Sequence, residues 1–173
     1  VSIRNQIKWG FIYIGLFIVS FVFGALSNQL FAPNFAGISN VKWDDSVGKV
    51  YTDIPYGDGK LNKFDLYVPA DGAKKSYKLV LYIHAGGFTG GDKADDAIWG
   101  KSFASRGYVG ATINYTLRNA ENTSANVYQM SLEIKKGVEV IKSEAAKKGY
   151  NLDGMIVAGG SAGGTLAMLY AFR

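Results

Sequence analysis

The chain has 173 residues, no cysteine and a formal net charge of +5, with 48% hydrophobic and 19% charged residues. This composition fits a folded domain that carries a hydrophobic appendage, and it excludes a disordered chain. The absence of cysteine excludes disulfide bonds, cysteine nucleophiles and thiolate metal sites. Lysines interleaved with glutamates on predicted helix faces supply most of the positive charge, so we expect no nucleic-acid partner.

The first predicted element is an uncharged apolar segment over residues 9–26, preceded by Arg4 and Lys8. It is long enough to cross a bilayer as a helix, and it has no polar face of the kind that a soluble helix shows. Two interpretations are open: a retained membrane anchor, and an export signal cut near residues 25–27. The length of the run favours the anchor. Both interpretations place the rest of the chain outside the cytoplasm, either anchored or secreted.

Three regions follow from this pattern. Residues 1–27 are expected to be the anchor or signal segment, and residues 28–46, which are rich in turn formers, a linker. Residues 47–173 are expected to be the N-terminal part of one α/β domain.

The domain opens with two alternating segments, residues 49–54 and 62–68, separated by Gly-Asp-Gly at 57–59. This pattern predicts a β-hairpin. Residues 78–83 form a nearly continuous apolar run, which is typical of a central strand covered on both faces.

Helices and strands then alternate. We predict a helix over residues 94–106, a strand over 108–115, a long helix ended by Gly149, a strand over 153–158 and a helix from Ser161 onward. The apolar residues of the long helix step by three and four: Val127, Met130, Ile134, Val138, Ile141 and Ala145. The order predicts a mostly parallel sheet with helices on both faces and a site at the carboxyl ends of the strands.

The strongest motif is Gly-Gly-Ser-Ala-Gly at residues 159–163, between a predicted strand and a predicted helix. This is the G-x-S-x-G nucleophile elbow in its expected context. The glycines remove Cβ atoms that would clash in so tight a turn. Ser161 is the predicted nucleophile, and the amide of Ala162 is placed to donate to an oxyanion.

A second motif, His-Ala-Gly-Gly-Phe at residues 84–88, directly follows the central strand. The amides of Gly86 and Gly87 can approach a substrate carbonyl closely. Each motif alone has another interpretation, a phosphate-binding turn for the first and a tight strand-to-helix connection for the second. Together they favour a hydrolase, and the lack of a following Gly-Lys-Ser/Thr disfavours a nucleotide P-loop.

From about residue 50 onward the chain resembles the N-terminal half of an α/β-hydrolase of the hormone-sensitive-lipase-like or BD-FAE-like esterase group. The resemblance rests on four motifs: residues 84–88, Gly-Gly-Asp-Lys at 90–93, Asn-Tyr-Thr-Leu-Arg at 114–118 and Gly-Gly-Ser-Ala-Gly-Gly at 159–164.

The resemblance implies that Ser161 is the nucleophile and that Gly86, Gly87 and Ala162 donate to the oxyanion. His84 would brace the loop. Two residues depart from the family pattern: Ala85 replaces a glycine without affecting the donors, and Thr116 replaces an arginine, which we expect to loosen the packing near the loop. No metal or organic cofactor is implied.

The resemblance implies that the catalytic acid and base follow the serine, so we expect them beyond Arg173. Asp153 lies at the start of its strand, the wrong end of the sheet, and is interpreted as a turn or capping residue. We therefore expect this chain alone to lack triad turnover and, with an unpaired sheet edge, to be prone to aggregation.

The sequence thus predicts a membrane-anchored, extracytoplasmic serine carboxylesterase or lipase that acts on a small-molecule ester, present here without its acid and base. Two alternatives remain, a non-catalytic binding or scaffold protein on a hydrolase fold and a peptidase of the same fold.

Overall fold

The computed structural model describes residues 3–31 and 41–172. The chain divides into two compact units, Val1–Ala36 and Gly37–Arg173. Each unit is described by itself.

The first unit contains one helix, α1 (Ile3–Phe31). Its window Ile7–Gly24 has a mean hydropathy of 1.8, and α1 is the one helix in the described residues that is long and apolar enough to cross a membrane. A signal sequence meets the same criterion. The helix continues through residues 28–31, where we expected a linker, and residues 32–40 of that predicted linker lie outside the described residues.

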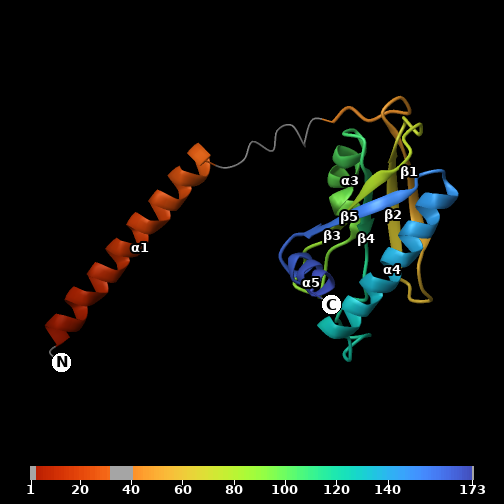
Figure 1. Cartoon of the computed structure of the whole chain (residues 1–173). Helices are drawn as coiled ribbons and strands as arrows, with labels where there is room; N and C mark the ends of the chain where they lie inside the picture. The colour runs from red at the N-terminus through yellow and green to blue at the C-terminus, as the bar shows by residue number, and fades with distance from the viewer. Residues whose placement is uncertain (1–2, 32–40, 173) are drawn as a thin grey trace. The chain divides into compact units, whose positions relative to one another are not determined.

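The second unit is built on a five-stranded sheet in the order β1-β2-β4-β3-β5 (Figure 1). The strands β1 and β2 form the predicted antiparallel hairpin, and β2 also pairs antiparallel with β4. Only β3 with β4 and β3 with β5 are parallel pairs. The sheet is therefore mixed rather than mostly parallel, because β4 lies between the hairpin and β3. The strands are Gly48–Pro55, Lys63–Pro69, Tyr77–Ile83, Val109–Ile113 and Leu152–Gly159, from β1 to β5.

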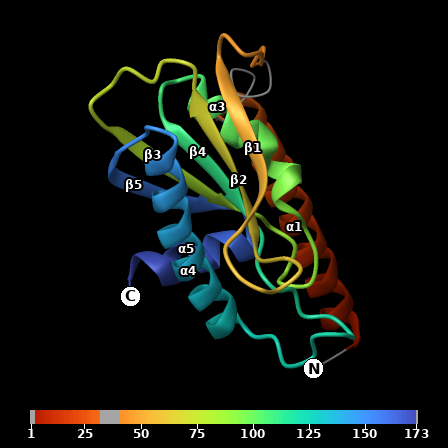
Figure 2. The ribbon, with the colours of Figure 1, turned by 90° about the vertical axis from the view of Figure 1, so that its right-hand side faces the viewer.

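Helices cover both faces of the sheet, as predicted. Figure 2 shows α4 and α5 on one face and α3 on the other. The predicted helix over residues 94–106 begins as a 3-10 turn, and only its later part is α-helical. The helical elements are η1 (Lys93–Asp96), α3 (Ala97–Ala104), α4 (Val127–Lys147) and α5 (Ala162–Ala171).

The core lies mainly between the sheet and α4. The predicted apolar stripe of α4 is buried, from Met130 to Ala145, against alternate residues of β3 and β4 such as Leu81 and Ala111. On the opposite face α3 approaches so closely that a Cβ atom on Gly100 would lie 2.3 Å from the ring of Tyr67.

Because β3, β4 and β5 run in the same direction, the segments that follow them leave the sheet at one edge. Those segments begin after Ile83, Ile113 and Gly159. Both glycine motifs therefore lie at the same edge, where open α/β sheets bind their ligands.

Candidate active site

Ser161 occupies the turn between β5 and α5, and its side chain is exposed. Its backbone has φ 46 and ψ −111, a left-handed conformation that residues with a Cβ rarely adopt. The turn is closed by the Gly163 N–H, which donates to the Gly160 carbonyl at 2.7 Å. The structure thus presents the predicted nucleophile on a sharp, strained turn at the start of a helix.

Two of the glycines around Ser161 are required by sterics. A Cβ on Gly163 would lie 2.0 Å from the Ile83 carbonyl oxygen, and one on Gly159 would lie 2.5 Å from the Gly163 carbonyl carbon. The predicted reason for glycine is confirmed at these two positions. At Gly160, by contrast, a Cβ would make only ordinary contacts, the nearest at 3.4 Å to Ala85 Cβ.

The segment after β3, residues 84–91, forms a loop that closes on itself, and we call it the glycine loop. Gly86, Gly87 and Phe88 all have positive φ, at 122, 61 and 67. The Gly86 carbonyl accepts hydrogen bonds from the N–H groups of Thr89 and Gly90, at 3.1 and 3.0 Å. These bonds turn the chain back within a few residues and leave Gly86 and Gly87 exposed.

The structure brings the glycine loop and the elbow together. Ala85 lies against Gly160, and Gly163 packs against the backbone of Ile83 and His84. Within residues 41–172, the amides of Gly86, Gly87 and Ala162 donate to no protein acceptor. These three amides are therefore available beside Ser161, and their role as oxyanion donors stays a prediction.

His84 is buried beneath the loop, with 2% of its surface exposed. Its Nδ1 lies 2.6 Å from the Ala85 carbonyl oxygen, and its ring stacks on Tyr115 with centroids 4.3 Å apart. Burial, with a smaller contribution from the charge of Asp96, raises the pKa of Tyr115 to about 12. The protonated hydroxyl donates to the His84 carbonyl at 3.2 Å. This environment fits a residue that braces the loop.

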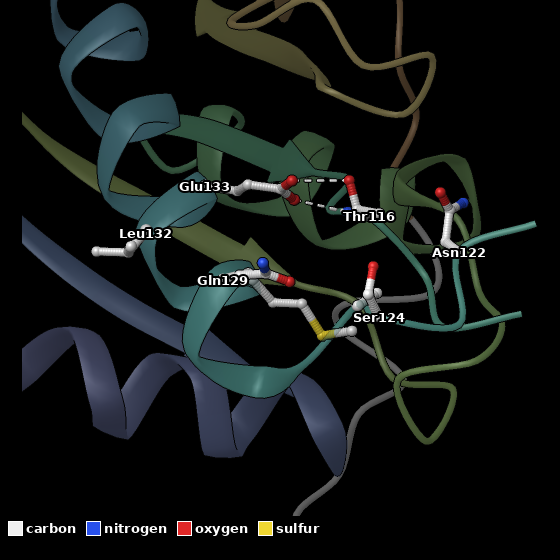
Figure 3. Close-up of a pocket in the computed structure, with 8 residues that line it drawn as sticks. Thr116, Asn122, Ser124, Gln129, Leu132 and Glu133 are labelled. Carbon is white, nitrogen blue, oxygen red and sulfur yellow. Dashed lines mark hydrogen bonds between the residues drawn. The ribbon is translucent and has the colours of Figure 1, made fainter.

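Thr116, which we expected to loosen the packing, is held firmly by Glu133. The Thr116 N–H and hydroxyl each donate to one carboxylate oxygen of Glu133, both at 2.7 Å (Figure 3). A cavity of about 310 Å³ opens next to this pair, at the start of α4. Two residues after Thr116 the chain contacts the glycine loop, where the Arg118 N–H donates to the Phe88 carbonyl at 2.9 Å. Sequence reasoning did not find this cavity.

Asp153 lies in β5 at the edge opposite Ser161, as expected, but it is not a cap. Its carboxylate pairs with Lys78 at 2.9 Å and accepts from the Ser76 hydroxyl at 2.8 Å. The hydrogen bond from Lys78, followed by that from Ser76, lowers the pKa of Asp153. It therefore links β3 to β5 on the surface, far along the strand from the elbow.

Sequence reasoning also missed two acidic residues that pair with Lys93. Asp65 lies between Phe64 and Leu66 in β2, and a charged residue inside a predicted strand was the available signal. Asp53 lies at an irregularity of β1, which no local pattern indicates. In the described part of the chain no cluster of three or more His, Asp and Glu residues could hold a metal ion.

Comparison with known proteins decides the family. A family model described as BD-FAE matches residues 64–173, which include both glycine motifs. The chain belongs to the BD-FAE family.

Relatives of this BD-FAE protein include two curated proteins. A probable isoprenylcysteine alpha-carbonyl methylesterase of Oryza sativa subsp. japonica is 29% identical over 69% of this chain and 28% of its own length. A kynurenine formamidase of Salmo salar is 26% identical over 71% of this chain and 39% of its own length.

Among solved structures, esterase B of Lactobacillus rhamnosis with a tributyrin phosphonate inhibitor has a TM-score of 0.65 at 22% identity. The match covers 91% of this chain and 48% of that protein. This likeness supports an α/β-hydrolase fold. The BD-FAE chain thus spans less than half the length of all three proteins.

Proposed function

We propose that this BD-FAE protein contributes the nucleophile and the oxyanion donors of a serine carboxylesterase or lipase. Its family and its esterase relatives support an ester hydrolase. The observation that carries the finer assignment is the geometry of Ser161, an exposed hydroxyl on a strained turn beside three unbonded amides. No observation in the described residues specifically supports the two alternatives, a scaffold protein and a peptidase.

In the proposed reaction, Ser161 Oγ attacks the carbonyl carbon of an ester while a general base takes its proton. The negative charge on the carbonyl oxygen is stabilised by the amides of Gly86, Gly87 and Ala162. The base returns the proton to the departing alcohol, which leaves an acyl-enzyme. Water, deprotonated by the same base, then attacks the acyl carbon and releases the carboxylic acid and free Ser161.

We propose that the base and its orienting acid lie outside these 173 residues. The chain has one histidine, His84, and its Nδ1 already contacts the Ala85 carbonyl in a buried site. The substrate is proposed to be a small-molecule ester, because the related esterase B is inhibited by a phosphonate of the tributyrin type.

We further propose that α1 anchors the protein in a membrane with the catalytic unit outside the cytoplasm. Its length and apolar composition support this location. Carbonate extraction of membranes, followed by protease treatment of intact cells, tests it. Release of the protein by carbonate, or protection from the external protease, would contradict the proposal.

The test of the catalytic proposal is hydrolysis of p-nitrophenyl butyrate by the intact protein that contains this chain. Ser161→Ala is expected to lower kcat by a factor of about 10⁴ or more, because the nucleophile is removed. Ser143→Ala, at an exposed serine of α4, is the matched control and should leave kcat unchanged. The 173-residue chain alone should show no turnover.

Three outcomes would count against this assignment. Unchanged activity in Ser161→Ala would exclude Ser161 as nucleophile. An intact wild-type protein that hydrolyses neither esters nor peptides would favour a scaffold. A burst of acyl-enzyme from the 173-residue chain, lost in Ser161→Ala, would show that its base lies within the chain.

A further inference from the structure

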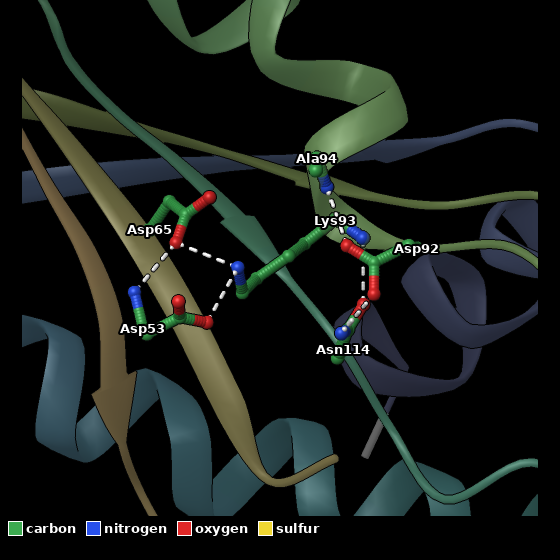
Figure 4. Close-up of polar contacts among 6 residues, drawn as sticks. All are labelled: Asp53, Asp65, Asp92, Lys93, Ala94 and Asn114. Carbon is green, nitrogen blue, oxygen red and sulfur yellow. Dashed lines mark hydrogen bonds and ion pairs between the residues drawn. The ribbon is translucent and has the colours of Figure 1, made fainter.

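A buried ion pair connects the segment after the glycine loop to the β1–β2 hairpin (Figure 4). The side chain of Lys93 is 7% exposed, and its Nζ lies 2.8 Å from Oδ1 of Asp65, whose side chain is 5% exposed. Asp53, which is 62% exposed, approaches the same Nζ at 3.0 Å. Within residues 3–31 and 41–172, Lys93 and Asp65 form the one ion pair with both side chains less than a tenth exposed.

Keeping the charged Lys93 buried requires a buried partner and a strained backbone. Burial by itself lowers the pKa of Lys93, but hydrogen bonds to Asp65 and Asp53 and the attraction of both carboxylates outweigh it and raise that pKa. Asp53 reaches the lysine because β1 is irregular between Tyr51 and Ile54, where Asp53 has φ 56. Its N–H also donates to Asp65 Oδ1 at 2.8 Å. A solvated surface lysine would need neither the strained backbone nor the buried partner.

The backbone around Lys93 is fixed as well. Its N–H donates to Asn114 Oδ1 at 2.6 Å, and Asn114 Nδ2 donates to Asp92 Oδ2 at 2.8 Å. The other carboxylate oxygen of Asp92 accepts from the Ala94 N–H at 2.8 Å and caps η1. Asn114 directly follows β4. The main chain of Lys93 and the side chain of Asp92 are therefore both bonded to a residue at the end of the sheet (Figure 4).

Lys93 is two residues after Gly91, the last residue of the glycine loop, so its position restricts that of the loop. Gly91 packs so tightly that a Cβ there would lie 2.3 Å from the Ala85 carbonyl oxygen and 2.5 Å from His84 Nδ1. The Gly90 N–H donates to the Gly86 carbonyl at 3.0 Å. Any displacement of the segment after the loop must therefore move its beginning, where Gly86 lies.

We propose that Lys93, held by Asp65 and Asp53, is a positioning residue that fixes the amides of Gly86 and Gly87 relative to Ser161. The inference rests on the proposed function in giving these amides a catalytic use, and its structural part does not depend on that use. An ion pair that only stabilised the fold would protect the whole unit evenly. A positioning residue protects the glycine loop more than the remaining core.

Hydrogen exchange in the intact protein that contains this chain separates these cases. In Lys93→Met, exchange of a peptide covering residues 84–91 should accelerate by about tenfold relative to a peptide covering residues 130–145 of α4, because the loop opens locally. Lys142→Met is the matched control, since Lys142 pairs with Glu139 on the surface of α4. It should leave that ratio unchanged.

An equal acceleration in both peptides, or none in either, would overturn the proposal. If Lys93→Met does not fold, Asp53→Asn is the variant that tests the proposal. It removes the charge of Asp53 but keeps the pair between Lys93 and Asp65. It should accelerate the loop peptide by about threefold relative to α4, and an unchanged ratio would refute positioning.

A second measurement concerns catalysis in the intact protein. Lys93→Met should lower kcat for p-nitrophenyl butyrate by about tenfold with KM nearly unchanged, because oxyanion donors act in the transition state. A change confined to KM would contradict a role in positioning the donors. If Ser161→Ala keeps full activity, the proposed function fails, while the exchange result still decides whether Lys93 positions the loop.

Discussion

The elbow and the glycine loop lie side by side, yet different forces shape them. The elbow is shaped by backbone sterics, since Gly159 packs against Gly163 and both glycines pack against the end of β3. The segment after the glycine loop is held by side chains, since Lys93 contacts Asp65 of β2 and Asn114, which follows β4. Local sterics can be recognised in a short motif, whereas contacts between strands require the folded sheet.

The difference also concerns how each region tolerates change. A Cβ added at Gly163 cannot be accommodated by moving neighbouring side chains, because the atoms that it would clash with belong to the backbone. The ion pair that holds the loop consists of flexible side chains and responds to charge and pH. We therefore expect substitutions in the elbow to cost more stability than the loss of the exposed member of the Lys93 cluster.

The largest effect is expected for Gly163→Ala compared with Gly160→Ala. The new Cβ would lie 2.0 Å from the Ile83 carbonyl oxygen at position 163, but 3.4 Å from its nearest neighbour at position 160. The first substitution should lower the free energy of unfolding by about 2–3 kcal/mol, and the second should change it by less than about 0.5 kcal/mol. Urea unfolding measures both. Equal losses would show that the elbow is not determined by sterics.

A smaller effect is expected when the backbone strain of Ser161 is released. Glycine adopts φ 46 without a Cβ penalty, whereas alanine retains it. Ser161→Gly should therefore be more stable than Ser161→Ala by about 1 kcal/mol. Thermal unfolding of the two variants gives the difference. An alanine variant that is at least as stable as the glycine variant would mean that this turn stores no strain.

The smallest effect is expected for Asp53→Asn, on the loop side of the comparison. The hydrogen bond from Lys93, and then its charge, lowers the pKa of Asp53 below its ordinary value of 3.8. The folded pKa is below the unfolded one, so the carboxylate contributes stability above pH 3.8 and loses that contribution as the pH falls through the folded pKa.

The stability difference between wild type and Asp53→Asn should accordingly be present at neutral pH and disappear in strong acid. Urea unfolding over a pH series measures it. Asp58→Asn controls for the loss of an exposed carboxylate in the same hairpin. A difference that grows toward acid pH would contradict the assigned ion pair.

Much of the fold followed from periodicity in the sequence. The hairpin, the buried strand that leads into His84 and the apolar stripe of α4 were all predicted from spacing and are confirmed. The pairing order was not, because spacing says nothing about which strands become neighbours. The insertion of β4 between β2 and β3 made the sheet mixed.

The site divides in the same way. Ser161 and the glycines of both motifs were identified from short stretches of sequence, since turn geometry restricts the residue types there. The hydrogen bonds of Thr116 to Glu133 were not predicted, because Glu133 is on α4 and distant in the chain. The Lys93 cluster was missed for the same reason: Asp53 and Asp65 are far from it in the chain.

The sequence by itself determined the elements, the elbow with Ser161 and the family-like motifs, because hydrophobic periodicity and short glycine-rich motifs can be recognised without the fold. Only the tertiary structure decided the strand order, the burial of His84 and the pairing of Lys93 with Asp65. These features depend on which distant segments meet at the sheet edge, and on burial that makes an unpaired charge costly.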